Sequence, residues 1–564
     1  MKVVIIGGVA GGASAAARLR RLNEHAQIIV FERTGFVSYA NCGLPYYIGG
    51  VIEDKEKLTL NTPESFWDRF RVDVRVRHEV TSIDTKNKTV TVHGLDTGKT
   101  YQESYDKLLL SPGARPIIPK MPGIESPRIF TLRTVEDTFK IKQFIEEKQP
   151  KSAVVVGGGF VGLETAENLH VAGINVTLVE LLDQVLTTLD YDMASFIHSA
   201  FRCEGINLRL SSEVEGFIDT EKGIRVNIKN SEPIDTDMVL FCIGVRPDSG
   251  LAKSAGLELG IKGSILVNDK METSEKDIYA VGDAIQIKHT ITGEPALVSL
   301  AGPASKQGRI AADNINGGDS RYKGSPGTSV IKLFDITAAS TGLTETAAKA
   351  KGYDYEKIIL SPPSHATYYP GAKTMTVKLI FEKSSLRILG AQIVGYDGVD
   401  KRIDVIATAI SLGASALDLM DLDLAYAPPY SSSKDPVNMA GFVIENIITG
   451  KVKQFHWHDI ENLPKDGSVI LLDTRTPAES SKGIIDGFKN IPVDDIRERI
   501  GELDRNKPVY ITCQVGIRGY IACRILEAEG FDVYNLSGGY RFYETVMKDK
   551  CPSPETYTCG ADKK

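Results

Sequence analysis

Short runs of wholly apolar residues alternate with glycine-rich turns and helical stretches along the first half of the chain. Val3 to Ile6 and Ala153 to Val156 are four-residue apolar runs, and a cluster of glycines follows each one. A continuous apolar run of this length is typical of a parallel strand that is buried on both faces. A helical stretch and a second strand come after each cluster, at 27–31 and at 175–179. The pattern therefore predicts two βαβ units.

The glycine clusters have the spacing of dinucleotide-binding turns. Gly157, Gly159 and Gly162 complete the pattern G-x-G-x-x-G, whereas the first cluster carries Val9 where the middle glycine belongs. A turn of this kind places a pyrophosphate at the N-terminus of the helix that follows it. Two such turns in one chain predict two dinucleotides, one that stays bound and one that exchanges.

An acidic residue ends the second strand of each unit. Glu32 lies 25 residues after Gly7, and Glu180 lies 23 residues after Gly157. A carboxylate at this position accepts hydrogen bonds from the ribose hydroxyls of a dinucleotide. Two leucines and no arginine follow Glu180, so the sequence favours NADH over NADPH, whose extra phosphate the carboxylate repels.

The second half of the chain predicts an α+β module and then a separate α/β module. Thr376 to Phe381 and Ile388 to Gly395 have the pattern of neighbouring strands, and Asp400 to Leu412 that of a helix. After a short linker, the apolar runs within 468–475 and 508–512 predict further strands.

Composition and charge exclude several classes of protein. The 564 residues are 42% hydrophobic and 25% charged, which is ordinary for a soluble chain of three or four domains. A net charge of −7 gives no general attraction to nucleic acid. We expect no membrane span, because no apolar run reaches about 18 residues. Met1 leads directly into the first strand, and we expect no signal peptide and a cytoplasmic location.

The seven cysteines are widely spaced and form no disulfide framework. Cys203, Cys242 and Cys523 lie in apolar contexts that favour packing roles. Cys551 and Cys559 lie in a tail that offers too few ligands for a metal, so we expect no metal site.

Cys42 stands apart, in the stretch Ser38 to Gly50, SYANCGLPYYIGG. Gly43 frees the backbone beside the sulfur, and Pro45 suits the first turn of a helix. A thiol near a helix N-terminus lies in a positive field, so we expect a thiolate. A thiolate attacks disulfide sulfur.

Cys513 begins a second candidate site, a loop that runs to Arg518 after an apolar strand. Such a loop directs successive backbone N–H groups toward one centre, which favours a thiolate and stabilises a persulfide anion. The sequence therefore predicts a reactive thiolate at Cys513.

Two more segments favour a flavin. Leu108 to Pro116, LLLSPGARP, is a strand that enters a turn, and Thr273 to Ala284 ends a strand at Asp283, which is placed to accept a bond from a ribityl hydroxyl. In this order the motifs of residues 1–445 resemble those of the flavoprotein disulfide reductases that have two dinucleotide domains. In having a single cysteine, Cys42, at this position, the chain resembles the branch that contains NADH oxidases, peroxidases and coenzyme A-disulfide reductases. The continuation NCGLPYYIGG is most similar to coenzyme A-disulfide reductases and persulfide reductases.

The resemblance implies a set of cofactor residues. For FAD and the nicotinamide they are Gly7, Gly8, Ala10, Gly11, Gly12, Glu32, Arg33, Asn41, Ser111, Pro112, Gly113, Asp283, Ala301, Gly157, Gly159, Phe160, Val161, Gly162, Glu180 and Gly244.

Coenzyme A is the substrate or bound ligand that the resemblance implies. Arg18 and Arg21 lie three residues apart on one helix face and suit its phosphates. The resemblance adds Ser14, Ser38, Asn41 and Lys434, and assigns Tyr368 and Tyr426 to the substrate sulfur, contributed across a homodimer.

The loop from Cys513 to Arg518 has six residues, as in rhodanese sulfurtransferases, although Gly483-Ile484-Ile485 replaces the usual Gly-His-Ile. The implied fold class is α/β, with two Rossmann-like domains, an α+β dimerisation domain and an α/β rhodanese domain. The expected limits are 1–110 and 245–325 for FAD, 111–244 for NAD(P)H, 326–450 for dimerisation, 451–457 for a linker, 458–550 for rhodanese and 551–564 for a tail.

The resulting hypothesis is an NAD(P)H-dependent reductase of coenzyme A disulfide, coenzyme A persulfide or polysulfide, with sulfane-sulfur transfer at Cys513. One alternative is an NADH oxidase or peroxidase that cycles Cys42 through a sulfenic acid. Another is a flavin-containing sulfur carrier or redox sensor.

Overall fold

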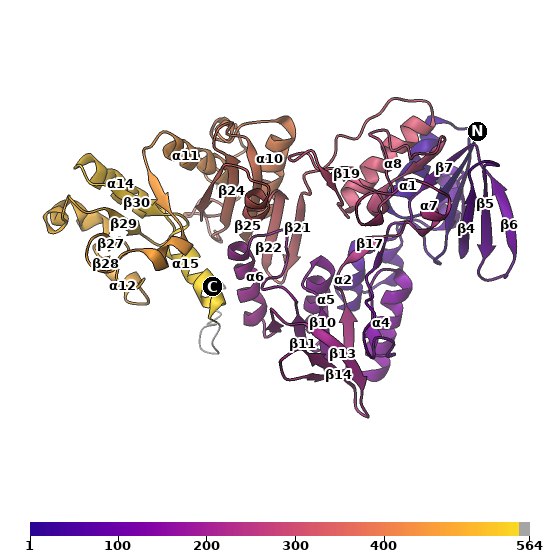
Figure 1. The fold of residues 1–564 in the computed structure, drawn as a ribbon, viewed down its shortest axis with the longest axis horizontal. Helices are drawn as coiled ribbons and strands as arrows, with labels where there is room; N and C mark the ends of the chain where they lie inside the picture. The colour runs from indigo at the N-terminus through magenta and orange to yellow at the C-terminus, as the bar shows by residue number, and fades with distance from the viewer. Residues whose placement is uncertain (552–564) are drawn as a thin grey trace. The chain divides into compact units, whose positions relative to one another are not determined.

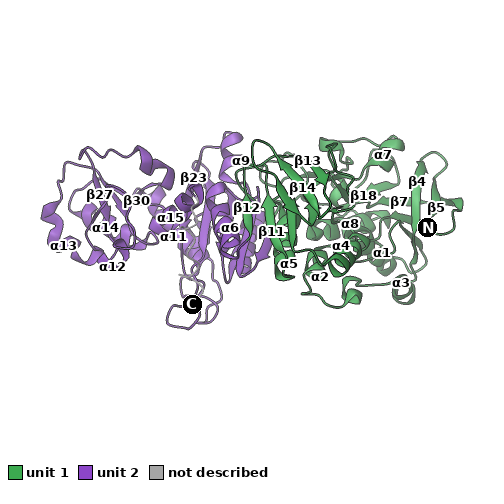
Figure 2. Ribbon diagram, turned by 90° about the horizontal axis from the view of Figure 1, so that it is seen from below, with its two compact units in different colours: residues 1–185, 206–327 green, residues 186–205, 328–564 purple. Residues whose placement is uncertain are grey.

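The computed structural model describes residues 1–551, so Cys559 lies outside the described residues. The chain forms two compact units (Figure 2). The first comprises residues 1–185 and 206–327, and the second comprises residues 186–205 together with the chain from 328 onward.

The first unit contains the first predicted repeat in a five-stranded parallel sheet. The strand order is β18 (Ile278–Ala280), β7 (Lys107–Leu110), β1 (Lys2–Ile6), β2 (Gln27–Glu32) and β3 (Asp73–Val76). Val3, Val4 and Ile5 of β1 have no exposed surface, as expected of a strand covered on both faces. Helix α1 (Ala10–Leu22) packs on this sheet, and α8 (Ala301–Ile315) lies beside α1 (Figure 1).

The second repeat builds an equivalent sheet in the same unit. Its strand order is β12 (Asn207–Arg209), β11 (Asn175–Val179), β10 (Ser152–Val156), β16 (Met238–Phe241) and β9 (Ile129–Phe130). In both sheets the first strand of the repeat lies between the second strand and a strand from later in the chain. The two predicted Rossmann-like folds are therefore confirmed. Helices α4 (Val135–Lys148) and α5 (Phe160–Val171) accompany the second sheet.

Smaller elements complete the first unit. The antiparallel sheets and pairs are β4 (His78–Asp84) with β5 (Thr89–Gly94) and β6 (Thr100–Ser104), β13 (Val214–Asp219) with β14 (Ile224–Ile228) and β15 (Ile234–Thr236), β8 (Ala114–Pro116) with β17 (Val245–Pro247), and β19 (Ile287–Lys288) with β20 (Pro295–Ala296). The short helices are α2 (Leu44–Ile48), α3 (Pro63–Phe70) and α7 (Gly250–Ser254).

The second unit contains the predicted α+β module as an antiparallel sheet. The strand order is β21 (Ser329–Leu333), β22 (Ile336–Gly342), β25 (Ile388–Gly395), β24 (Thr376–Glu382) and β23 (Tyr355–Leu360). The predicted neighbours β24 and β25 pair directly. The helices of this module are α9 (Glu345–Ala350), α10 (Val399–Leu412) and α11 (Pro436–Ile448).

The C-terminal module of the second unit is a parallel α/β sheet. Its strand order is β26 (Lys453–Phe455), β30 (Val533–Leu536), β29 (Val509–Thr512), β27 (Ile470–Asp473) and β28 (Lys489–Asn490). Its helices are α12 (Pro477–Ser480), α13 (Ile496–Arg499), α14 (Ile517–Ala528) and α15 (Gly539–Lys550).

Helix α6 (Tyr191–Cys203) packs within the second unit, although its residues fall inside the predicted limits 111–244 of the NAD(P)H domain. The buried amine of Lys378 explains this packing, since it lies 2.9 Å from Asp192 and 3.1 Å from Asp190. At the other end of the helix, His198 lies 2.7 Å from Asp549 of α15. A buried charge is stable only when it is paired in this way.

Among residues 1–551, no helix has the length and apolar character that crossing a membrane requires. Within the same residues no cluster of His, Cys, Asp or Glu side chains is arranged to hold a metal ion.

Candidate active sites

The first glycine turn forms a cradle that side chains would fill. Gly7 has φ +96°, and a Cβ there would lie 2.1 Å from the carbonyl oxygen of Ser111. A Cβ on Gly12 would lie 1.9 Å from the carbonyl oxygen of Gly7. Helix α1 then begins with no side-chain cap and no acidic residue in its first turn. Its free N–H groups and dipole suit a pyrophosphate.

The second glycine turn repeats this construction. Gly157 has φ +109°, and a Cβ on Gly162 would lie 1.9 Å from the carbonyl oxygen of Gly157. A Cβ on Gly159 would meet nothing within 4 Å, so this middle glycine faces open space. Helix α5 also starts without a side-chain cap or an acid in its first turn. Both turns therefore fit a dinucleotide.

Both predicted ribose acids reach back to their glycine turns. Glu32 Oε2 accepts a hydrogen bond of 3.0 Å from the amide of Gly8. Glu180 Oε2 accepts one of 2.5 Å from the amide of Gly158. The structure thus brings each carboxylate to the edge of its turn, beside the predicted pyrophosphate position.

The predicted flavin segments converge on the first turn from distant parts of the sequence. A Cβ on Gly11 would lie 2.9 Å from Ser111 Oγ and 2.8 Å from a methyl group of Val281. Asp283 follows β18 at this edge, and desolvation raises its pKa to about 6. These residues fit FAD, which Gly7 to Gly12, Glu32, Ser111 and Asp283 would hold.

The remaining predicted cofactor residues have defined places. Arg33 donates to Asp248 at 3.0 Å, and the carbonyl of Pro112 accepts from Arg133 at 2.9 Å. Gly113 and Gly244 have φ values of +71° and +120°. Ala10, Phe160 and Ala301 begin α1, α5 and α8, with Val161 next to Phe160; Val161 and Ala301 are exposed.

Cys42 lies in a single 3₁₀ turn, Asn41–Gly43, which leads into α2. Cys42 and Asn41 are exposed, whereas four of the other described cysteines are partly or fully buried. The stretch is attached to the first glycine turn, because the amide of Ser38 donates to the carbonyl of Gly8 at 2.8 Å. Ser38 has φ +51° and accepts a 3.3 Å bond from Asn61.

The electrostatics at Cys42 differ from the expected stabilisation of a thiolate. Although the residue is exposed, the surrounding protein shields its sulfur from part of the solvent; this desolvation raises the pKa of the Cys42 thiol, and the charges of Glu164 and Asp283 raise it further. Helix α2 has only five residues, so its dipole is too small to outweigh two carboxylates. In this state of the site the thiol form is favoured.

Tyr46 and Glu164 complete the surroundings of Cys42, and the sequence analysis missed both. The Tyr46 hydroxyl donates to Glu164 Oε1 at 3.4 Å. Burial, with the charge of Glu167, raises the pKa of Glu164 to about 7. A signal was available, since Tyr46 lies one helical turn after Cys42 and Glu164 lies two residues after Gly162.

Within residues 1–551, only some of the coenzyme A residues predicted in the first unit are free of an ion pair and open to bind a ligand. Arg18 donates to Asp313 at 2.7 Å, which compensates its charge. Arg21 is exposed and has no ion pair among the described residues, and Ser14 is half-buried on the same helix. Arg21 is therefore the cation best placed to meet a phosphate from solvent.

The predicted tyrosines of the second unit are brought together. The hydroxyls of Tyr368 and Tyr426 lie 2.7 Å apart, and the two residues are 74% and 47% exposed. Arg402 fixes both loops, because its guanidinium donates to the carbonyl of Ser364 at 2.9 Å and to Asp435 at 2.9 Å. Lys434 is exposed beside Asp435.

Cys513 is fully buried at the end of β29. Its Sγ accepts a bond of 3.1 Å from the amide of Gly516, which has φ +99°. The start of α15 holds the loop from the other side, because the amides of Tyr540 and Arg541 donate to the carbonyls of Cys513 and Gln514. Of the predicted N–H donors of the loop, the amide of Gly516 is the one that meets the sulfur.

The charged residues of this loop are paired. Arg518 makes two bonds of 2.7 Å to Glu479, and this pairing lowers the pKa of Glu479 to about 2. The carbonyl of Gly483 accepts a 2.6 Å bond from Arg475, and Ile485 is buried. Ile484, which replaces the usual His of this stretch, is 42% exposed, so the packing of the stretch comes from Ile485 and from the bond to Gly483. Glu479 was also missed, since its partner lies 39 residues away.

Two dinucleotide-binding folds lie in one unit with the exposed cysteine Cys42. This combination defines an oxidoreductase with a thiol centre. The family models for pyridine nucleotide-disulphide oxidoreductase, its dimerisation domain and the rhodanese-like domain match residues 1–308, 328–436 and 457–544. The chain belongs to the pyridine nucleotide-disulphide oxidoreductase family and carries a C-terminal rhodanese-like domain. This family implies FAD and a nicotinamide cofactor.

Several relatives are similar over most of their length. Coenzyme A disulfide reductase of Staphylococcus aureus (strain JH9) is 39% identical over 442 residues, 78% of this chain and 99% of that protein. The reduced Bacillus anthracis CoADR-RHD structure is 49% identical, covers 97% of this chain and 98% of its own, and has a TM-score of 0.94. The NAD-dependent persulfide reductase from A. fulgidus is 37% identical, covers 96% and 100%, and has a TM-score of 0.90.

Proposed function

We propose that the protein reduces coenzyme A disulfide, coenzyme A persulfide or polysulfide with electrons from NAD(P)H, through Cys42. The similar proteins named coenzyme A disulfide reductase and persulfide reductase support this choice of substrate. A reducing, cytoplasmic setting is part of the proposal, because both thiols must stay free.

The observation that carries the proposal is the position of Cys42 between the two dinucleotide folds. Ser38 attaches the Cys42 stretch to the first glycine turn. Glu164 stands on α5, the helix of the second turn, and its charge acts on the Cys42 thiol. Asp283 acts on the same thiol from the end of β18. These relationships support a role for this sulfur in passing electrons from the two dinucleotides to the substrate.

The proposed reaction is thiol–disulfide exchange at Cys42. The Cys42 thiol first loses its proton to solvent; the thiolate attacks one sulfur of the substrate, the substrate S–S bond breaks, and one thiol or hydrosulfide leaves. The other half of the substrate stays on Cys42 in a mixed disulfide or persulfide; FAD, when bound, would supply the two electrons that release it as thiol or hydrosulfide and return Cys42 to the thiolate. Tyr46 and Glu164 lie beside the sulfur, and a carboxyl with a pKa of about 7 can hold a proton at neutral pH.

Coenzyme A would bind through Arg21, Ser14, Ser38 and Asn41, with Lys434 contributed across a homodimer. The exposed pair Tyr368 and Tyr426 supports this arrangement, because two tyrosines so open to solvent suit a surface that a partner subunit covers.

The C-terminal module would transfer sulfane sulfur at Cys513. The amide of Gly516 at 3.1 Å supports this role, because it can stabilise a persulfide anion on the sulfur. Replacing Cys513→Ala should remove sulfur transfer and leave the reduction of small disulfides nearly intact. A loss of both activities would contradict two separate sites.

Anaerobic turnover tests the reductase against the alternatives. The holoenzyme is mixed with NADH and either coenzyme A persulfide or hydrogen peroxide, and NADH absorbance is followed. Rapid multiple turnover with the persulfide and negligible turnover with peroxide is the expected result. Faster turnover with peroxide would favour a peroxidase, and the absence of multiple turnover with both would favour a carrier or sensor.

A further inference from the structure

We propose that the Cys513 site is selective for monoanionic organic persulfides and discriminates against dianionic sulfur donors such as thiosulfate. This inference rests on the proposed sulfur transfer at Cys513 and adds the class of donor. It follows from the net charge of the side chains around the loop Cys513 to Arg518, and from the exposed side chains next to that loop.

Two of the arginines that contact the loop region are neutralised by carboxylates. Arg518 is bound by Glu479 through two bonds of 2.7 Å. Arg475 is buried and lies 2.7 Å from Asp473, which is also buried. Since each carboxylate cancels one guanidinium, these four side chains bring no net charge to the loop.

A third arginine, Arg541, contacts the loop through its backbone, but its guanidinium lies away from the loop. The backbone amide of Arg541 donates to the carbonyl of Gln514. Its guanidinium lies 5.4 Å above the ring of Phe196 and donates to Thr376 at 3.1 Å. The charge of Arg541 is therefore engaged on α6 and β24, outside the sulfur loop.

The other side chains of the loop carry no charge. Gln514, Val515 and Ile517 occupy positions between Cys513 and Arg518. Ile517 is 53% exposed, and Ile521, one turn later on α14, is 42% exposed. Residues four apart on a helix lie on the same face, so Ile517 and Ile521 form an exposed apolar strip that begins at the loop and suits an uncharged organic group, with Arg497 and Arg524 lining the hollow beside Ile521.

Sulfur transfer from a monoanionic persulfide requires only the Cys513 sulfur and the Gly516 amide of the loop. The Cys513 thiolate attacks the outer sulfur of RS–S⁻, the S–S bond breaks, and RS⁻ leaves and takes a proton from water. The outer sulfur and one negative charge remain on Cys513 as a persulfide anion, which the Gly516 amide meets at 3.1 Å. Thiosulfate brings a second charge on its sulfonate, and the loop has no uncompensated arginine to receive it.

Two substitutions add one positive charge at the loop by independent routes. Glu479→Gln keeps the shape of the side chain and releases the charge of Arg518. Ile517→Lys places a cation at the first residue of α14, on a side chain that is already exposed.

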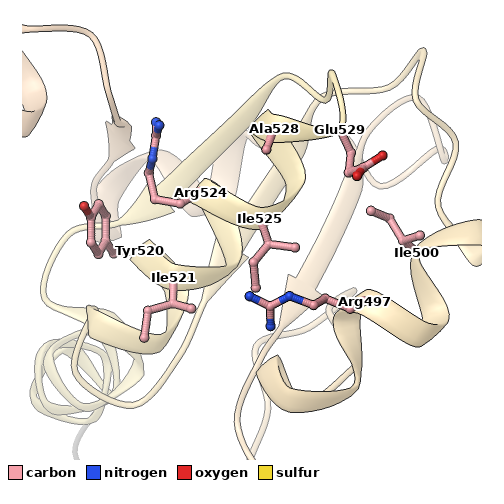
Figure 3. Close-up of a pocket in the computed structure, with 8 residues that line it drawn as sticks. All are labelled: Arg497, Ile500, Tyr520, Ile521, Arg524, Ile525, Ala528 and Glu529. Atoms are coloured by element: carbon pink, nitrogen blue, oxygen red, sulfur yellow. The ribbon is translucent and has the colours of Figure 1, made fainter.

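Ala528→Lys is the matched control. It adds the same charge to the exposed last turn of α14, where Ala528 borders a hollow that Ile521 also lines (Figure 3). Eleven residues of helix separate the positions, about 16 Å. That exceeds the Debye length of about 10 Å at 0.1 M salt.

The test measures loading of Cys513 in the full-length holoenzyme by mass spectrometry, with pantetheine persulfide or thiosulfate as donor. We expect wild type to load at least about tenfold faster from the persulfide. Glu479→Gln and Ile517→Lys should each raise the thiosulfate rate by about tenfold, while Ala528→Lys changes neither rate. Retained loading of Cys513 from pantetheine persulfide reports that the C-terminal module of each variant is folded, and NADH-dependent reduction of a small disulfide reports the same for the part of the chain that contains Cys42.

Equal loading of wild type from both donors, or loop variants that behave like Ala528→Lys, would overturn the selectivity. Failure of wild type to load from either donor would instead overturn the proposed sulfur transfer itself.

Discussion

The hydroxyl groups of Tyr368 and Tyr426 lie 2.7 Å apart and join two loops that are 58 residues apart in the sequence. Both side chains are exposed. The hydrogen bond to Tyr426 raises the pKa of Tyr368, so Tyr368 holds its proton at neutral pH. Arg402 holds the two loops that carry the pair, because it donates hydrogen bonds to Ser364 and Asp435. This pre-ordered pair of donors suits a site completed in a dimer.

Mixed dimers test whether the tyrosines act on the partner's sulfur. One chain carries Cys42→Ser and the other carries Tyr368→Phe with Tyr426→Phe, each with its own affinity tag. In a two-fold dimer only one of the two sites then keeps both its cysteine and its tyrosines. We expect about half of the wild-type turnover from purified mixed dimers.

The parent homodimers are the controls. Cys42→Ser homodimers should be inactive, and the double phenylalanine homodimer should be slower than wild type by about 10²-fold. If the mixed dimers are no faster than that double variant, the tyrosines act within their own chain, contrary to the proposal.

Glu164 should tune the reactivity of Cys42. Its charge raises the pKa of the thiol, and with a pKa of about 7 it is ionised in the range where the thiol titrates. Removing the charge with Glu164→Gln should therefore lower the pKa of Cys42 and speed alkylation by iodoacetamide at pH 8. The measurement is the alkylation rate against pH in the reduced holoenzyme.

Glu167→Gln removes a carboxylate from the same helix that does not act directly on Cys42. Because Glu167 contributes to raising the pKa of Glu164 to about 7, the alkylation rate should stay nearly unchanged at pH 8 and above, where Glu164 is ionised with or without Glu167. A Glu164→Gln profile that coincides with the wild-type profile would show that this carboxylate does not act on the thiol.

The cofactor preference should depend on Glu180. Its carboxylate is held against the second glycine turn, because it accepts a 2.5 Å hydrogen bond from the amide of Gly158. We expect wild type to favour NADH over NADPH in kcat/KM by about tenfold or more, which needs only about 1.4 kcal/mol. Glu180→Ala should reduce or reverse that ratio. A wild-type enzyme that clearly prefers NADPH would refute this role.

The sequence predicts the parts of the sites that depend on short spacing. Gly7 to Gly12, Gly157 to Gly162 and the loop from Cys513 to Arg518 are local, because turn, helix start and sulfur lie within six residues. Each of these turns forms as expected, and so do the two equivalent sheets.

Long-range packing explains what the sequence analysis missed. Tyr46 meets Glu164 across 118 residues, and Arg518 meets Glu479 across 39. The expected thiolate at Cys42 also depended on non-local residues, because Glu164 and Asp283 oppose the dipole of a short helix. No local pattern reveals which distant carboxylates will surround a thiol.

The central claim is that Cys42 is the sulfur through which electrons reach the substrate. The most direct measurement is NADH-dependent reduction of coenzyme A persulfide by Cys42→Ser, with FAD content read from its visible absorbance. We expect turnover to fall by at least about 10³-fold while the variant retains its FAD. Turnover near the wild-type rate in Cys42→Ser with FAD bound would contradict the proposal.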